Sequence, residues 1–143
     1  MAVILNVESR LPDRYARIER CFSIARTVCE QLEEKRIKYS FLTTAMTAGA
    51  LGAWSSMAEG LGRTHLMAIL EGLGRASYDT SEHFVRTLER AARMAEHGRS
   101  HIVITPDDDV VIAEALAAFS RRMGGELLTV TADMSEREEV VAT

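Results

Sequence analysis

Three segments of the chain carry polar side chains that could bind one ligand together. One follows an apolar run at residues 2–7, one precedes an apolar-periodic run that starts at Leu66, and one follows an apolar run at residues 102–104. Their candidate residues are Asn6, Glu8 and Ser9 in the first segment, Arg63, Thr64 and His65 in the second, and Thr105, Asp107, Asp108 and Asp109 in the third. Carboxylate and hydroxyl oxygens on three converging loops are the ligands that a hard cation such as Mg²⁺ requires.

The same residue types also cap helices, which gives these segments a second interpretation. Thr64, and either Asp107 or Asp108, stand where a side-chain oxygen could accept from the free amide groups of a first helical turn. An acidic side chain at such a position is also stabilised by the helix dipole. For residues 107–109, capping is the more common role of this pattern, and metal contact is the alternative.

Motifs for other chemistry are incomplete. The four histidines show no metal-ligand spacing, and only His65 belongs to one of the three segments. Gly60 and Gly62 precede a helix and could cradle a phosphate, but the Gly-x-Gly-x-x-Gly pattern is not completed, and neither a P-loop nor a Gly-x-Ser-x-Gly nucleophile motif occurs. We therefore expect a protein that is not an enzyme, with no catalytic or cofactor-binding residue.

The clearest structural signal lies at residues 102–110. Ile102, Val103 and Ile104 form an uninterrupted apolar run, Pro106 ends it, and a new apolar-periodic segment begins at Val110. This is the pattern of a buried parallel strand that enters a helix from its carboxyl end. Ligands of open α/β sheets bind at that edge of the sheet, so the pattern also indicates where the three polar segments would meet.

The rest of the chain alternates between strand and helix patterns in the same way. Further strands are predicted at 2–7, 37–43 and 126–131, beside the one at 101–105. Helices are predicted from Pro12 and Asp13 to about Leu32, from Gly62 to about Gly74, from a capping box formed by Asp79 and Glu82 to Gly98, and from about Asp108 to Met123. The small-residue region from Thr44 to Gly62, which contains Trp54, is interpreted as a loose hairpin or edge strand.

Length and composition predict one domain. A chain of 143 residues with 47% hydrophobic and 27% charged residues is typical of a single globular unit, here 1–143, with a tail at 133–143 that frays. Alternating strands and helices predict the α/β class: three layers, doubly wound, around a mostly parallel sheet, with an antiparallel edge hairpin as a variant.

Charge, hydropathy and cysteines restrict partners and compartment. The net charge of −4 argues against nucleic acid as the main partner. No segment reaches the roughly 20 apolar residues of a membrane helix, and no basic segment precedes the first apolar run as in a signal peptide. Cys21 and Cys29 lie about 12 Å apart along one predicted helix, too far for a disulfide, so we expect reduced thiols and a cytoplasmic protein.

Three stretches give the chain a family resemblance from Ala2 to about Ala132. These are Val3-Ile-Leu-Asn-Val-Glu-Ser9 with the later helix Ser23-Ile-Ala-Arg-Thr-Val, Gly62-Arg-Thr-His-Leu66 leading into Ile69-Leu-Glu-Gly-Leu73, and Ile102-Val-Ile-Thr105. In order and spacing they resemble the von Willebrand factor A-like part of a bacterial family named domain of unknown function 58. The resemblance implies a von Willebrand A-like or Rossmann-like sheet. Such proteins typically carry a membrane-anchored amino-terminal part and are encoded beside MoxR-type AAA+ ATPases, so we expect this chain to be the carboxyl-terminal piece of such a protein or a shortened relative.

The resemblance also implies where a metal would lie. Metal-binding members of the wider fold end their first strand with Asp-x-Ser-x-Ser, and a threonine and a later aspartate complete the site. Here Asn6, Glu8 and Arg10 replace the first three ligands, Thr64 matches the threonine, and Asp107 is displaced by one position behind Pro106. A guanidinium at this place would repel a divalent ion, so we expect a degenerate site without metal, with Mg²⁺ as the less favoured alternative.

Together these observations predict a non-enzymatic protein-interaction domain that works with a MoxR-type ATPase in complex assembly. The interaction loops would consist of Glu8, Ser9, Arg63, Thr64, His65, Asp107 and Asp108. The alternative is a small-ligand or divalent-metal site at the same edge of the sheet. A third interpretation is a homodimer in which the Trp54 segment is an unpaired edge that a second copy covers.

Overall fold

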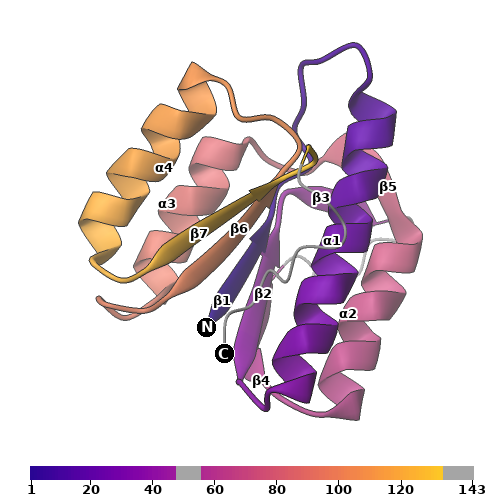
Figure 1. Ribbon diagram of the computed structural model, residues 1–143, viewed down its shortest axis with the longest axis vertical. Helices are drawn as coiled ribbons and strands as arrows, with labels where there is room; N and C mark the ends of the chain where they lie inside the picture. Colours follow the sequence, from indigo (N-terminus) through magenta and orange to yellow (C-terminus); the bar gives the residue numbers. More distant parts are fainter. Residues whose placement is uncertain (48–55, 134–143) are drawn as a thin grey trace.

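The computed structural model describes residues 1–47 and 56–133 and contains a five-stranded sheet in the order β4-β2-β1-β6-β7 (Figure 1). The strands of this sheet are β1 (Ala2–Leu5), β2 (Tyr39–Thr43), β4 (Ser56–Gly60), β6 (His101–Thr105) and β7 (Leu127–Thr131). β1 lies in the centre and pairs in parallel with both β2 and β6, and β7 pairs in parallel with β6. β4 is the one antiparallel member and pairs with β2. The predicted α/β class with a mostly parallel sheet is thereby confirmed.

Helices cover both faces of the sheet and bury it between them (Figure 1). α1 (Arg14–Glu34) and α2 (Arg63–Arg75) pack on one face, and α3 (Phe84–Met94) and α4 (Val110–Met123) pack on the other. In β1, Val3 and Leu5 belong to the α1 side and Ile4 belongs to the α3 side, and all three are at most 1% exposed. Because both faces of the central strands are covered, their sequences are continuous apolar runs rather than alternating ones.

A second, two-stranded sheet joins a strand from the region Thr44 to Gly62, interpreted above as a loose hairpin or edge strand, to a strand that was not predicted. β3 (Ala45–Thr47) pairs antiparallel with β5 (Ala76–Thr80). The predicted capping box is therefore wrong, because Asp79 lies within β5 and α3 begins only at Phe84, where the N-cap residue His83 makes no capping bond. Just after β5, the backbone N–H of Ser81 donates to the carbonyl of Thr44 at 2.7 Å, so pairing with a distant segment overrides the local capping pattern.

The remaining predictions on local structure have mixed outcomes. β4 confirms an edge strand within the region from Thr44 to Gly62, whereas Trp54 and residues 134–143 lie outside the described residues. α3 ends at Met94, before the predicted stop at Gly98. Cys21 and Cys29 are both buried and free, as the helix spacing predicts. Of the helices that the structure describes, none is both long and apolar enough to cross a membrane.

Candidate functional site at the carboxyl edge of the sheet

The chain changes direction across the sheet between β1 and β6. The connection through α1 carries the chain from β1 to β2 on one side, whereas the connection through α4 carries it from β6 to β7 on the other side. The carboxyl ends of β1 and β6 therefore form a topological switch point, where open α/β sheets place their ligand sites. Residues 6–10 and 106–109 meet there, which confirms that the first and third of the predicted polar segments converge.

The second predicted segment lies at the opposite edge of the sheet. Because β4 is antiparallel, its last residue, Gly60, pairs with Tyr39 at the amino end of β2, and only Leu61 and Gly62 separate β4 from α2. His65 accordingly lies with Nε2 2.9 Å from the Tyr39 carbonyl oxygen. A five-residue strand spans about 15 Å, so Arg63, Thr64 and His65 do not join the other loops. The expectation that all three segments converge is wrong.

Thr64 does not act as a helix cap either. The N-cap of α2 is Gly62, which has a φ of 115° and no side chain with which to bond the first turn. Its backbone N–H donates instead to both carboxylate oxygens of Glu33 at the end of α1, at 2.9 and 3.1 Å. This contact fixes the start of α2 to α1, far from the switch point.

Asn6 connects the ends of three strands through its buried amide. Its Nδ2 donates to Thr105 Oγ1 at 3.1 Å and to the Glu8 carbonyl at 3.4 Å. Its Oδ1 accepts from the Glu8 backbone N–H at 2.9 Å and from Thr44 Oγ1 at 3.3 Å. Both ends of the amide are therefore hydrogen-bonded within the protein, as a fully buried polar group requires.

Asp107 is also bonded by its own chain. The side chain of Ser9 donates to Oδ1 at 2.8 Å, and the backbone N–H of Arg10 donates to Oδ2 at 2.9 Å. Its positive neighbour is Arg17, whose Nε lies 3.7 Å from Oδ1. The resemblance aligns Arg10 with a metal ligand, but its side chain is 68% exposed and lies 4.0 Å from Glu8. The guanidinium beside Asp107 is therefore that of Arg17.

Arg17 links this edge to the end of β7. Its Nε donates to the Pro106 carbonyl at 2.9 Å, and its two terminal nitrogens donate to the two carboxylate oxygens of Asp133 at 3.1 and 2.8 Å. The hydrogen bonds to Asp133 raise the pKa of Arg17, and the same bonds lower the pKa of the Asp133 carboxyl group. The sequence pattern gave no sign of this role, because Arg17 lies on the polar face of a long helix.

These residues do not fit a magnesium site of the kind that the resemblance implies. Both oxygens of Asp107 already accept hydrogen bonds, a guanidinium lies beside them, and Thr64 is at the other edge of the sheet. Within residues 1–47 and 56–133, no group of three His, Cys, Asp or Glu side chains is arranged to hold a metal ion. Asp109, rather than Asp107 or Asp108, caps α4 by accepting from the Ile112 N–H at 3.0 Å.

A cleft of about 330 Å³ lies between the β1 loop and the first turns of α3 and α4. We call it the switch-point cleft; its walls include Glu8, Arg10, His83, Val85, Arg86, Asp109 and Val111. Glu8 Oε2 lies 3.0 Å from His83 Nδ1 and accepts from the Phe84 N–H at 3.3 Å, so a carboxylate occupies the positive end of α3. His83 was not among the residues predicted for this edge; it follows β5 in the chain and meets Glu8 from 75 positions away.

Apolar side chains surround this cleft on the solvent side. Val85 on α3 and Val111 on the first turn of α4 line the cleft and are 47% and 49% exposed. Val110, the chain neighbour of Val111, is 70% exposed. Charged side chains of both signs lie between them, with His83 84% and Arg10 68% exposed. The arrangement offers an apolar centre and a polar rim on loops that are held by internal hydrogen bonds.

Comparisons with known proteins add no assignment. A scan against protein-family models gives no match, and a search of curated proteins finds no similar sequence.

Proposed function

We propose that this protein is a non-enzymatic protein-interaction domain that binds its partner at the switch-point cleft. The observation that carries the proposal is the exposure of Val85 and Val111 in the wall of one cleft. A β-branched apolar side chain that is exposed on the first turn of a helix contributes little to the stability of the fold. Apolar groups that gather on a surface inside a charged rim are typical of binding interfaces.

The hydrogen bonds beneath the cleft support this interpretation. Asn6 fixes the β1 loop to β2 and β6, and Asp107 fixes it to the β6 loop. Loops that are already held in one conformation lose less conformational entropy when a partner binds. At the positions where a metal ion would hold the loops of this edge together, amide, hydroxyl and guanidinium groups of the chain hold them together instead.

The partner that we propose is a MoxR-type AAA+ ATPase, a choice that rests on the family resemblance alone. An ATPase of this kind draws on cytoplasmic ATP, so the proposal also places the domain in the cytoplasm. The buried, free Cys21 and Cys29 suit such a reducing compartment.

The experiment compares two double variants for binding to a purified MoxR-type ATPase, by calorimetry and by the rate of ATP hydrolysis. Val85→Asp with Val111→Asp places charge in the apolar wall of the cleft and is expected to weaken binding at least tenfold. The control, Met67→Asp with Thr64→Ala, alters exposed residues on α2 and is expected to bind like the unaltered domain. Equal binding by both double variants would refute the proposed surface, and no binding by the unaltered domain would refute the ATPase as partner.

A further inference from the structure

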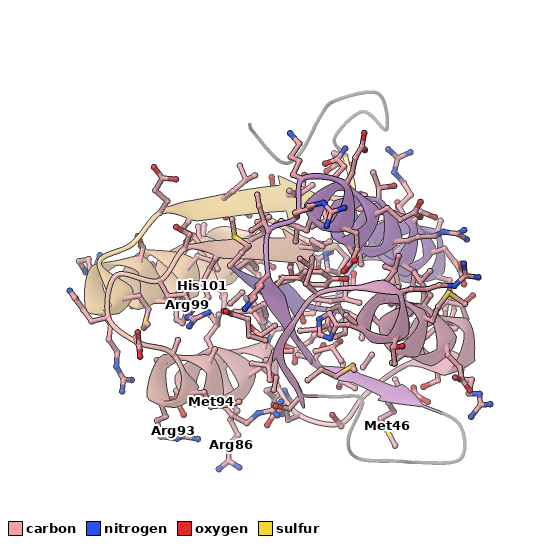
Figure 2. The ribbon with its side chains drawn as sticks, turned by 90° about the horizontal axis from the view of Figure 1, so that it is seen from below. Met46, Arg86, Arg93, Met94, Arg99 and His101 are labelled. Carbon is pink, nitrogen blue, oxygen red and sulfur yellow. The ribbon has the colours of Figure 1, made fainter. Side chains whose placement is uncertain are left out.

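β7 forms an outer edge of the main sheet without the features that protect such edges. It ends the strand order, and Figure 2 shows it, in yellow, along the upper margin of the ribbon. Its residues, Leu127–Thr131, include no charged residue, glycine or proline, and their pairing with β6 is regular over all five positions. The other outer strand, β4, contains Glu59 and pairs irregularly with β2. Because charges and bulges protect an edge from further pairing, β7 is the edge that stays open to another strand.

The backbone of β7 offers alternate residues to such a strand. The backbone N–H of His101 in β6 donates to the carbonyl of Glu126, the residue before β7, at 2.9 Å. Every second residue of β7, beginning with Leu128, therefore bonds to β6. The residues whose N–H and C=O groups point away from β6 are Leu127, Thr129 and Thr131. None of these outward groups forms a backbone hydrogen bond with another described residue.

The outward residues are arranged symmetrically about Thr129. When two β7 strands pair antiparallel about a two-fold axis at this residue, the two Thr129 residues exchange both of their hydrogen bonds. Each Leu127 then lies opposite Thr131 of the other copy, which adds further hydrogen bonds of the same kind. Leu128 is 40% exposed and lies opposite Val130 of the other copy, where the two side chains form an apolar cross-strand pair.

α4 lies beside this edge and contributes a second surface. Val111, on its first turn, lines the switch-point cleft together with residues of α3, so this side of α4 faces α3. By helical spacing, the opposite side carries the small residues Ala113, Ala117 and Ser120, which are exposed or half-buried. A specific interface buries about 800 Å² on each partner, more than a strand edge about 16 Å long provides. The α4 helices of two copies therefore have to meet as well, and small side chains let them approach closely.

Glu114 and Arg121 match the same two-fold axis. Both are exposed on α4, and neither forms an ion pair with another described residue. Their midpoint lies about 8 Å of helix before the end of α4 at Met123, and Thr129 lies about 7 Å of strand after the start of β7. Because the chain reverses between α4 and β7, the axis through Thr129 also passes near the midpoint of α4. It thereby places Glu114 of each copy opposite Arg121 of the other.

We propose that two copies of this chain form a dimer through β7. Antiparallel pairing joins their sheets into one, and two ion pairs between Glu114 and Arg121 hold the α4 helices side by side. A second copy suits this edge better than an unrelated strand, because the hydrogen bonds, the apolar pair and the charges are all self-complementary about one axis. The switch-point cleft lies on the other side of α4 and stays open in both copies. The dimer therefore does not depend on the function proposed for that cleft.

Sedimentation equilibrium over a range of protein concentrations tests the dimer. The unaltered protein is expected to give twice the mass of the chain. Thr129→Pro removes an outward N–H group at the axis and none that bonds to β6, so it is expected to give a monomer with an unchanged urea midpoint. The cleft variant, Val85→Asp with Val111→Asp, is the control and is expected to remain a dimer, which keeps the two proposals distinguishable.

A charge exchange tests the axis itself. Glu114→Arg places like charges opposite each other and is expected to weaken the dimer by about tenfold. Addition of Arg121→Glu restores opposite charges and is expected to return the dissociation constant to that of the unaltered protein. The matched control is Arg122→Glu, which alters the neighbouring residue on the side of α4 that faces α3 and is expected to leave the dimer unchanged.

Three results would overturn the proposal. The first is a monomer at every concentration up to the millimolar range. The second is a dimer that Thr129→Pro leaves intact, because a different surface would then form it. The third is a Glu114→Arg variant that dimerises as well as the unaltered protein, or whose defect Arg121→Glu does not repair.

Discussion

At the scale of single residues, hydrogen bonds of polar side chains hold together the loops at the carboxyl edge of the sheet. In the sequence, the same side chains suggested a metal or ligand site. Asn6, Glu8, Ser9 and Asp107 could be assigned to one edge from the sequence, because each follows a strand of apolar residues. Their roles could not be assigned in that way. Whether a carboxylate binds a metal or accepts hydrogen bonds depends on groups far along the chain, such as Arg17, which is 90 residues before Asp107.

Asn6→Ala tests whether this network stabilises the fold. The substitution removes the amide that donates to the buried Thr105 Oγ1 and the acceptor for the half-buried Glu8 N–H. A buried group left without its hydrogen bond costs about 1–3 kcal/mol, so we expect the free energy of unfolding to fall by about 3 kcal/mol. Urea denaturation measures it, with the exposed Asp108→Ala as the control, expected within about 0.5 kcal/mol of the unaltered protein. A cost for Asn6→Ala no larger than that of the control would show that the network contributes little.

The buried His101 makes stability depend on pH. Burial lowers its pKa in the folded state below the ordinary value of 6.5, so the unfolded chain takes up a proton first as the pH falls. The contribution of the neutral ring is present above pH 6.5 and is lost as the pH falls from there through the folded-state pKa. Denaturation between about pH 7.5 and pH 5 should therefore show a decline that is smaller in His101→Phe than in the unaltered protein. If stability declined equally with falling pH in the unaltered protein and in His101→Phe, the result would contradict this prediction.

At the scale of elements, apolar patterns predicted the strands and helices of the main sheet, and long-range pairing decided the rest. β5 carries polar and half-buried residues, so its strand character comes from β3, about 30 residues away, rather than from its own sequence. The antiparallel direction of β4 could likewise not be predicted from the residues of the strand. Because this strand runs antiparallel, α2 starts at the amino edge of the sheet and Thr64 cannot join Asn6 and Asp107.

Helix caps allow a direct comparison of a capping pattern with an observed cap. Asp109 accepts from the Ile112 N–H, whereas Asp79 lies in β5 and caps nothing. We expect Asp109→Ala to lower the free energy of unfolding by about 1 kcal/mol. Asp79 is exposed, so Asp79→Ala is expected to change the free energy of unfolding by less than about 0.5 kcal/mol. Thermal denaturation of the two variants side by side measures both values, and a larger loss for Asp79→Ala would restore the capping box.

At the scale of the whole molecule, strand order determines which surfaces exist. The sequence predicts that the sheet is doubly wound, but not that β1 and β6 lie side by side at its centre. That order creates the switch point and brings Glu8 and His83 together across 75 positions of the chain. It also leaves part of one face bare between α3 and β4.

The most direct measurement is an NMR titration of the domain, with labelled valine and leucine methyl groups, by a MoxR-type ATPase. Binding at the switch-point cleft predicts that the methyl signals of Val85 and Val111 shift or broaden first. Those of Leu66, at the start of α2, and of the buried Val28 should stay unchanged. Changes confined to Leu66 and its neighbours, or no change at saturating ATPase, would contradict the account.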